Sequence, residues 1–178
     1  MADYNLAHRG ALLASEVAVG LALLAFIGFL AALVPVIWRA GQESLAVAVG
    51  ISGGAFVAMG FASNAAETAL IWVADNNQPA AVAALDQLQG RTPIVWNITA
   101  LVAALSLAIY RTGLVWRWLG LVGLVAAAVF LLGSVFSVLG RTAEGRSSLV
   151  GVGLFIVWML ALSVGLWRTA PRSALPRP

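Results

Sequence analysis

The sequence predicts an all-α, polytopic membrane protein, an antiparallel bundle of five transmembrane helices. Hydrophobic residues make up 62% of the 178 residues and charged residues only 10%, whereas soluble domains average roughly 45–50% and about 25%. The mean hydropathy is +0.98. The few charges lie between long apolar runs, so the bilayer must be the solvent for most of the chain.

Five apolar runs are long enough to cross a hydrocarbon layer of roughly 30 Å. We predict spans at about residues 11–38, 45–74, 92–110, 116–139 and 149–167. A shorter run starts at Pro79 and stops at Gly90, which are typical helix boundary residues, and predicts a short interfacial helix between spans two and three. The proline-broken, basic residues 168–178 predict a disordered tail. Residues 1–178 are expected to form a single transmembrane domain.

Composition also excludes several functions. The chain has no cysteine and one histidine, so we predict no cofactor and no thiolate or multi-histidine metal site. Its ten basic residues are scattered arginines, a pattern of membrane topology that predicts no nucleic-acid partner. No GxSxG, HExxH or phosphate-loop motif is present. We therefore predict no catalytic residue, and a non-enzymatic role is favoured.

The arginines also predict an orientation. Six of them fall on one side of the predicted bundle and four on the other. Because basic residues are enriched on the cytoplasmic side of membrane proteins, we expect the C-terminus in the cytoplasm and the N-terminus outside.

The second span carries the chain's main polar chemistry. Asn64, Glu67 and Thr68 lie within an otherwise apolar run, and Gly60, Asn64 and Glu67 share one helical face. A buried carboxylate costs roughly 2.5–3.5 kcal/mol at a helix centre, so it is normally paired or functional. Because antiparallel spans alternate direction, Glu16 and Asn97 are expected at a similar depth on the same side. We predict an outward-open polar pocket formed by Glu16, Asn64, Glu67, Thr68 and Asn97.

Two carboxylates in a low dielectric cannot both stay ionised at little cost, so a proton or a cation would bind between them. The leading hypothesis is a small-ligand-binding or lipid-binding protein, or an accessory subunit. The alternative is a small transporter coupled to protons or cations that acts as an oligomer, and a carboxylate-based membrane enzyme is third. A structural alternative is that Glu67 only ties helices together by hydrogen bonding. Expected partners are the lipid bilayer, a small ligand or cation, and a second copy or another membrane protein.

Small residues and one tryptophan predict helix contacts. Gly120, Gly123 and Ala127 in the fourth span, and Gly151 and Gly153 in the fifth, would allow close helix packing. Most tryptophans fall at span ends, as in an aromatic belt. Trp158 lies in mid-span, where helix packing is preferred over ligand contact.

Two segments carry a family resemblance, YNLAHRGALLASE and LAIYRTGLVWRWLGLVGLV. They resemble uncharacterised small polytopic membrane proteins of high-GC bacteria, of the domain-of-unknown-function type, which usually have six spans. The resemblance implies a bacterial cytoplasmic membrane, and it implies that this chain lacks the first span. It implies no activity.

Overall fold

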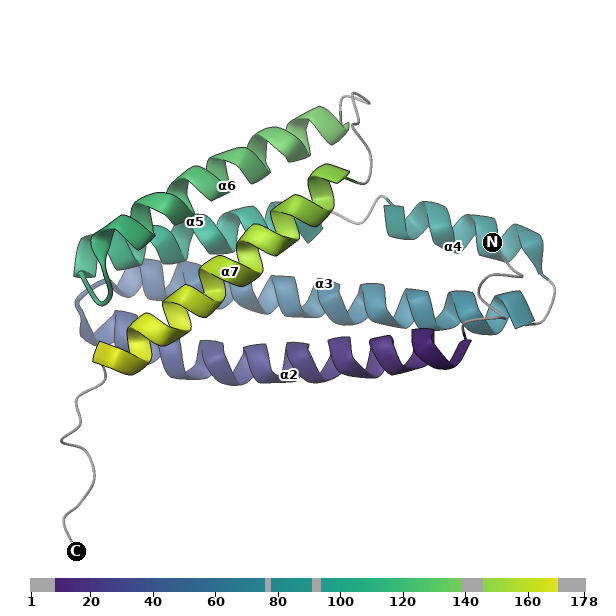
Figure 1. Cartoon of the computed structure of the whole chain (residues 1–178), viewed down its shortest axis with the longest axis horizontal. Helices are drawn as coiled ribbons and strands as arrows, with labels where there is room; N and C mark the ends of the chain where they lie inside the picture. The colour runs from purple at the N-terminus through teal and green to yellow at the C-terminus, as the bar shows by residue number, and fades with distance from the viewer. Residues whose placement is uncertain (1–8, 76–77, 91–93, 139–145, 170–178) are drawn as a thin grey trace, which may run out of the picture.

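The structure, a computed structural model, describes residues 9–75, 78–90, 94–138 and 146–169. These ranges form six helices and no strand, which confirms the all-helical class. The helices are α2 (Arg9–Arg39), α3 (Glu43–Asp75), α4 (Pro79–Gly90), α5 (Ile94–Thr112), α6 (Arg117–Val138) and α7 (Arg146–Thr169) (Figure 1).

The helices agree with a membrane protein. Among the described residues, three stretches are long and apolar enough to cross a bilayer, namely Gly10–Arg39, Glu43–Val73 and Arg117–Val135. In α7 the described apolar stretch, Gly153–Arg168, is shorter. Every helix begins and ends within three residues of the boundary that the sequence predicts. The predicted disordered tail lies outside the described residues from 170 onward.

Two glycines in left-handed backbone conformations end helices. Gly41 has φ 77° after α2, and Gly113 has φ 64° after α5. Most other residues would be strained at such angles, whereas glycine adopts them freely. The amide of Gly113 donates to the carbonyl of Ile109 at 2.9 Å, which closes the last turn of α5. These turns reverse the chain from α2 into α3 and from α5 into α6.

The α2–α3 hairpin is packed by glycines that face leucines. A Cβ atom built at Gly53 would lie 2.6 Å from Leu30 Cδ1, and one at Gly60 would lie 2.8 Å from Leu23 Cδ2. Gly53 and Gly60 are seven residues apart along α3, and their partners Leu30 and Leu23 are seven residues apart along α2, in the opposite direction. A seven-residue repeat is the period of helices that wrap around each other. In lipid, such close packing replaces the hydrophobic effect as the force between helices.

The helices α5, α6 and α7 form a second packed unit. A Cβ atom at Gly120 would lie 2.8 Å from the carbonyl oxygen of Ser106, and one at Gly123 would meet both Ser106 and the ring of Trp158. Ala127, one turn further along α6, is also buried. The predicted role of Gly120, Gly123 and Ala127 in close packing is therefore confirmed.

In α7 the prediction for the glycines was wrong at Gly153. This residue is exposed and has open space where a Cβ atom would lie, and the side-chain position of Gly151 lies outside the described set. The close approach is made instead by Gly165, where a Cβ atom would collide with Val115 of the α5–α6 turn. Gly153 therefore faces away from a partner helix, whereas Gly165 lies where α7 meets the α5–α6 turn.

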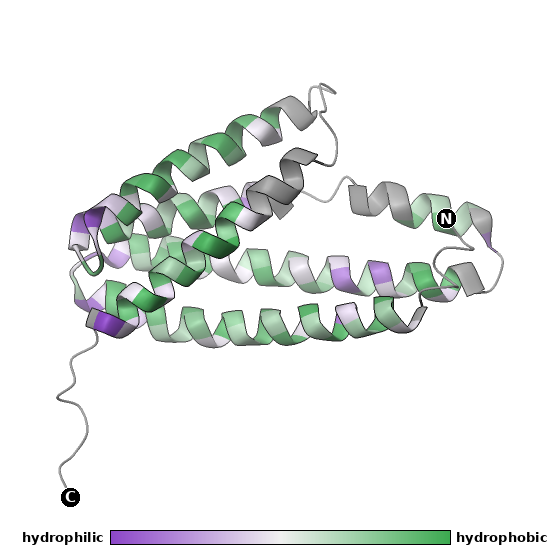
Figure 2. Ribbon diagram, viewed as in Figure 1, coloured by the Kyte–Doolittle hydropathy of each residue, from purple (hydrophilic) through white to green (hydrophobic). Residues whose placement is uncertain are grey.

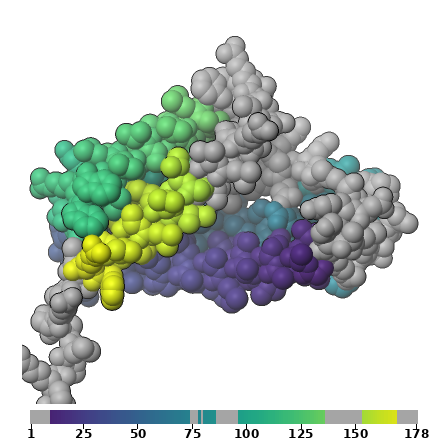
Figure 3. All heavy atoms as spheres, viewed as in Figure 1, coloured from purple at the N-terminus to yellow at the C-terminus, as the bar shows by residue number. Residues whose placement is uncertain are grey.

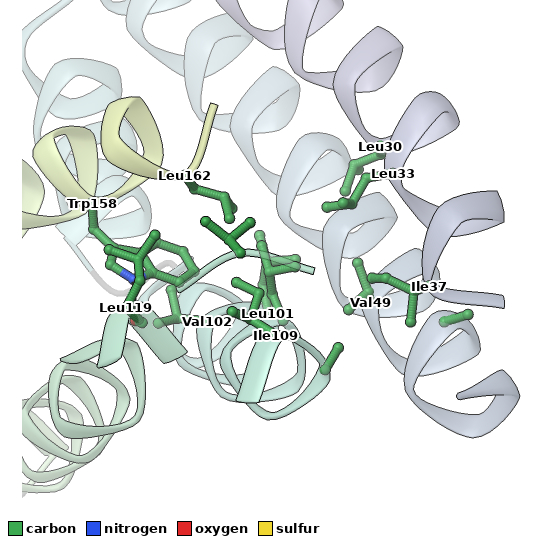
Figure 4. Close-up of a cluster of buried hydrophobic side chains, with 14 of the residues drawn as sticks. Leu30, Leu33, Ile37, Val49, Leu101, Val102, Ile109, Leu119, Trp158 and Leu162 are labelled. Atoms are coloured by element: carbon green, nitrogen blue, oxygen red, sulfur yellow. Dashed lines mark hydrogen bonds between the residues drawn. The ribbon is translucent and has the colours of Figure 1, made fainter. Parts of the chain in front are cut away.

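The core is centred on α5, which contacts α3 on one side and α6 on the other. Its Leu101, Leu105 and Ile109 are almost completely buried, four residues apart on one face. Figure 4 shows Leu101 and Ile109 between Leu119, Trp158 and Leu162 on one side and Val49 on the other. The indole nitrogen of Trp158 donates to the carbonyl of Leu119 at 3.0 Å, as expected for helix packing.

Helix α7 also reaches the hairpin. The ring of Phe155 lies 6.3 Å from that of Phe56 on α3, which in turn meets Phe26 on α2 edge-on at 5.5 Å. In the space-filling view α7 lies across one face of the molecule, between α6 and α2 (Figure 3). This aromatic row joins the two packed units near the middle of the bundle.

The helices differ in length, and the difference positions the candidate site. Helices α2 and α3 have 31 and 33 residues, or about 46 and 50 Å at 1.5 Å per residue. Helix α5 has 19 residues, or about 28 Å by the same rise. The hairpin therefore extends beyond α5 at the end away from the α5–α6 turn, and there α4 packs alongside α3 (Figure 1).

Candidate functional site

The seven-residue repeat of the hairpin places two acidic residues opposite each other. One step beyond Gly60 along α3 is Glu67, and one step before Leu23 along α2 is Glu16. At this next step of the repeat, Glu67 takes the position of the glycine on α3, and Glu16 takes the position of the leucine on α2. Figure 2 shows hydrophilic residues in this second half of α3, within an otherwise apolar ribbon.

The two carboxyl groups are in direct contact. A side-chain hydrogen bond joins Glu16 to Glu67. A hydrogen bond between two carboxyl groups needs a proton on one of them, because an ionised carboxylate can only accept. Oε2 of Glu16 is buried and has no hydrogen-bond partner among the described residues. The pair thus offers an acceptor oxygen that the described part of the protein leaves unsatisfied.

Asn64 fixes this contact from the side of α3. Its Nδ2 donates to the backbone carbonyl oxygen of Glu16 at 2.9 Å. The bond crosses between helices, and it holds the turn of α2 that carries Glu16 at a defined height against α3. Gly60, one turn earlier, has no side chain to keep α2 away. The spacing of Gly60 and Asn64 therefore brings the helices together, as predicted.

Thr68 is close in sequence, but its hydroxyl points back along its own helix. Its Oγ1 donates to the carbonyl oxygen of Asn64 at 3.0 Å, the usual bond of a threonine within a helix. Thr68 therefore stands beside the acidic pair, and its recorded bond is internal to α3.

Asn97 lies at a different depth. It is a half-buried residue of α5, thirteen residues before Tyr110, or about 20 Å from the α5–α6 end. Glu67 is twenty-four residues beyond Glu43, or about 36 Å from that end. The two were expected at similar depth, but α3 extends past the start of α5, which separates them. None of the hydrogen bonds that the structure records among the described residues joins Asn97 to Glu16 or Asn64.

Measured from the same end, the acidic pair lies farther along the helices than the roughly 30 Å thickness of a hydrocarbon layer. Glu16 is twenty-two residues before Trp38, or about 33 Å away.

The sequence reading missed Leu23, the residue of α2 in the layer below the pair. Its contact with Gly60 closes the seam on the side of the pair that faces the α2–α3 turn. The signal was present, since Leu23, Leu30 and Ile37 repeat every seven residues and all are buried. The repeat identifies Leu23 as a contact residue only when its partner glycine on α3 is also known.

No further acidic side chain, histidine or cysteine joins the pair in the described part of the chain. The described residues contain no cluster of three or more histidine, cysteine or acidic side chains. No protein-family model, no characterised protein and no solved structure matches the chain. The chemistry of the pair must therefore be argued from its own geometry.

Proposed function

We propose that the protein is a small-ligand-binding protein of the bacterial cytoplasmic membrane, in which Glu16 and Glu67 bind a cation or the cationic group of a small ligand. The observation that carries the proposal is the hydrogen-bonded contact of two carboxyl groups from different helices, with one buried oxygen left without a partner in the described residues. A cation could replace the shared proton and satisfy both groups.

The proposal includes a topology with five spans, α2, α3, α5, α6 and α7. Helices α5 and α6, at about 28 and 33 Å by their rise, match the hydrocarbon thickness. Helix α4 would then lie outside the hydrocarbon, in the headgroup region, alongside the projecting end of α3. The arginines near the α5–α6 turn favour the cytoplasm for that end, so the acidic pair would face outward.

Thermal unfolding of the purified protein in detergent tests the ligand class. We expect one of sodium, calcium or tetramethylammonium chloride, compared at equal ionic strength, to raise Tm at neutral pH. A ligand present at a hundred times its Kd would stabilise by about 2.7 kcal/mol. The increase should shrink as the pH falls, because protons compete with the cation for the same oxygens.

Two substitutions locate the effect. Glu67→Gln and Glu16→Gln should each abolish the cation-dependent rise in Tm, because an amide adds donors where the cation needs acceptors. Glu43→Gln, which removes an acid at the other end of α3, is the matched control and should respond as the parent does. If no cation stabilises the parent, or Glu67→Gln responds equally, the pair only holds the helices together.

The transporter alternative gives a different result. Vesicles containing the protein and a pH-sensitive dye would show a proton flux that Glu67→Gln abolishes. Cation-dependent stabilisation without any flux supports the binding role, in which the protein acts alone or as the accessory subunit of a larger assembly.

A further inference from the structure

Four arginines from four helices gather at the end of the bundle opposite the acidic pair. Arg39 ends α2, Arg111 lies in the last turn of α5, Arg117 begins α6, and Arg168 lies in the last turn of α7. All four are exposed. We call this the basic end. Glu43, at the start of α3, is the one acid that the described helices bring to it.

The turn between α5 and α6 presents two of these arginines together. Gly113 closes the turn in a left-handed conformation, which leaves Arg111 and Arg117 on either side of it. Arg117 folds back over the turn, with its Nε 3.8 Å from the position that a Cβ atom would take at Gly113. This distance is an ordinary van der Waals contact, and it places the guanidinium group of Arg117 beside the turn.

Exposed aromatic residues surround the same arginines. The rings of Trp116 and Trp118 stack at 6.1 Å, inclined by 13°. Both are about half exposed, at 48% and 55%. Further exposed aromatic residues at this end are Trp38, Tyr110 and Trp167. Such rings favour the headgroup level of a bilayer, with an apolar body in the lipid and a polar edge in the water.

Arginines at this level meet lipid phosphates directly. The guanidinium group binds phosphate oxygens in a bidentate way and stays charged at all physiological pH values. A zwitterionic headgroup offers a phosphate with its own cation beside it, whereas an anionic headgroup leaves the phosphate charge uncompensated. With four exposed arginines and a single acid, the basic end is complementary to anionic headgroups.

We infer that the basic end binds anionic phospholipids, and that Arg111 and Arg117 of the α5–α6 turn hold the lipid phosphate. The stacked Trp116 and Trp118 fix the turn at the depth where that phosphate lies. This site is at the opposite end of the molecule from Glu16 and Glu67, so it stands whether or not the acidic pair binds a cation.

Quenching of tryptophan fluorescence by brominated lipid tests the inference. The protein is reconstituted into phosphatidylcholine vesicles that contain a small fraction of brominated lipid. The brominated lipid is either phosphatidylcholine or phosphatidylglycerol, at the same fraction in both samples. We expect stronger quenching by the brominated phosphatidylglycerol in the parent protein. An arginine near an anionic surface changes binding about five-fold, so Arg111→Gln with Arg117→Gln should weaken the preference at least about five-fold.

Two controls complete the experiment. Arg9→Gln, an arginine at the other end of α2, should keep the preference, and so should the charge-conserving pair Arg111→Lys and Arg117→Lys. The preference should also fall as salt is added, because the interaction is electrostatic. Equal quenching by both lipids in the parent would overturn the inference, as would an unchanged preference after Arg111→Gln with Arg117→Gln. Displacement by inorganic phosphate beyond that by chloride of equal ionic strength would also overturn it, in favour of a soluble phosphate.

Discussion

The two main helix seams of this protein are both built on glycines, but their glycines face different partners. In the α2–α3 seam, Gly53 and Gly60 face the ends of leucine side chains, which can swing aside. In the α5–α6 seam, Gly120 faces the backbone of α5, at the carbonyl oxygen of Ser106 and the amide nitrogen of Tyr110. The α2–α3 seam can therefore accommodate an added methyl group, whereas the α5–α6 seam cannot. The candidate site lies in the seam that yields.

This difference separates stability from function along the chain. The α5–α6 seam, together with Trp158 and Leu162, forms the rigid part of the molecule. The α2–α3 seam adds a polar layer at the end away from the α2–α3 turn without losing its seven-residue register. A small movement of α2 against α3 would change the distance between the two carboxyl groups and leave the core of α5 unchanged.

The largest expected effect is at Gly120. Alanine there would place its Cβ atom 2.8 Å from a backbone oxygen that cannot move aside, and overpacking costs typically about 1–3 kcal/mol. Alanine is more favourable than glycine within a helix by about 0.5–1 kcal/mol, which offsets part of this cost. Gly120→Ala should therefore lower the free energy of unfolding by up to about 2.5 kcal/mol by these terms, as measured by detergent-denaturant titration.

Gly60→Ala is the matched test of the yielding seam. Its Cβ atom would meet only the end of Leu23, so the cost of repacking should be offset by helix propensity, and the stability should change by less than about 0.5 kcal/mol. An equal loss of stability in Gly60→Ala and Gly120→Ala would remove the distinction between the seams.

An intermediate effect is expected at Trp158. Phenylalanine keeps most of the ring but removes the bond from the indole nitrogen to the Leu119 carbonyl. A hydrogen bond contributes about 0.5–1.5 kcal/mol, and Trp158→Phe should destabilise the protein by that amount. The free energy of unfolding is measured by detergent-denaturant titration, as for Gly120→Ala. A stability equal to that of the parent would mean that the bond contributes nothing.

A smaller effect on stability than at Trp158 is expected at Asn64. Asn64→Ala removes the bond to the Glu16 carbonyl, and interhelical bonds in membranes average about 0.6 kcal/mol. The effect on ligand binding should be larger, because Glu16 loses its fixed height against Glu67. We expect a weaker cation-dependent rise in Tm than in the parent protein. Full retention of that response would show that Asn64 does not position the pair.

Much of the fold could be predicted from the sequence because lipid imposes simple rules. Apolar runs bounded by glycine, proline and arginine gave helix limits close to those observed, as for Arg9–Arg39 and Arg117–Val138. The shared face of Gly60, Asn64 and Glu67 followed from helical periodicity alone. The contact between Glu67 and Glu16 could not be predicted in the same way, because it depends on how α2 is aligned along α3. That alignment follows only when the seven-residue repeat is recognised on both helices.

The errors in prediction have a common physical cause. Asn97 was placed beside Glu67 because all spans were assumed to end at one level, whereas α3 continues well past the start of α5. Gly153 was assigned to a helix contact, but α7 packs through Gly165 instead. Both errors concern the relative position of helices along and across the bundle, which depends on crossing geometry and is absent from the local sequence.

The unequal helix lengths have a consequence for the surrounding lipids. The exposed side of α2 carries no charge and a single serine, Ser15, from Leu12 to Trp38, about 39 Å of helix, while α6 offers about 33 Å from Arg117 to Val138. A bilayer of uniform thickness cannot match both sides of one molecule. Either the protein tilts, or acyl chains stretch beside α2 and relax beside α6, so neighbouring molecules would meet across membrane of unequal thickness and prefer to approach through matching sides.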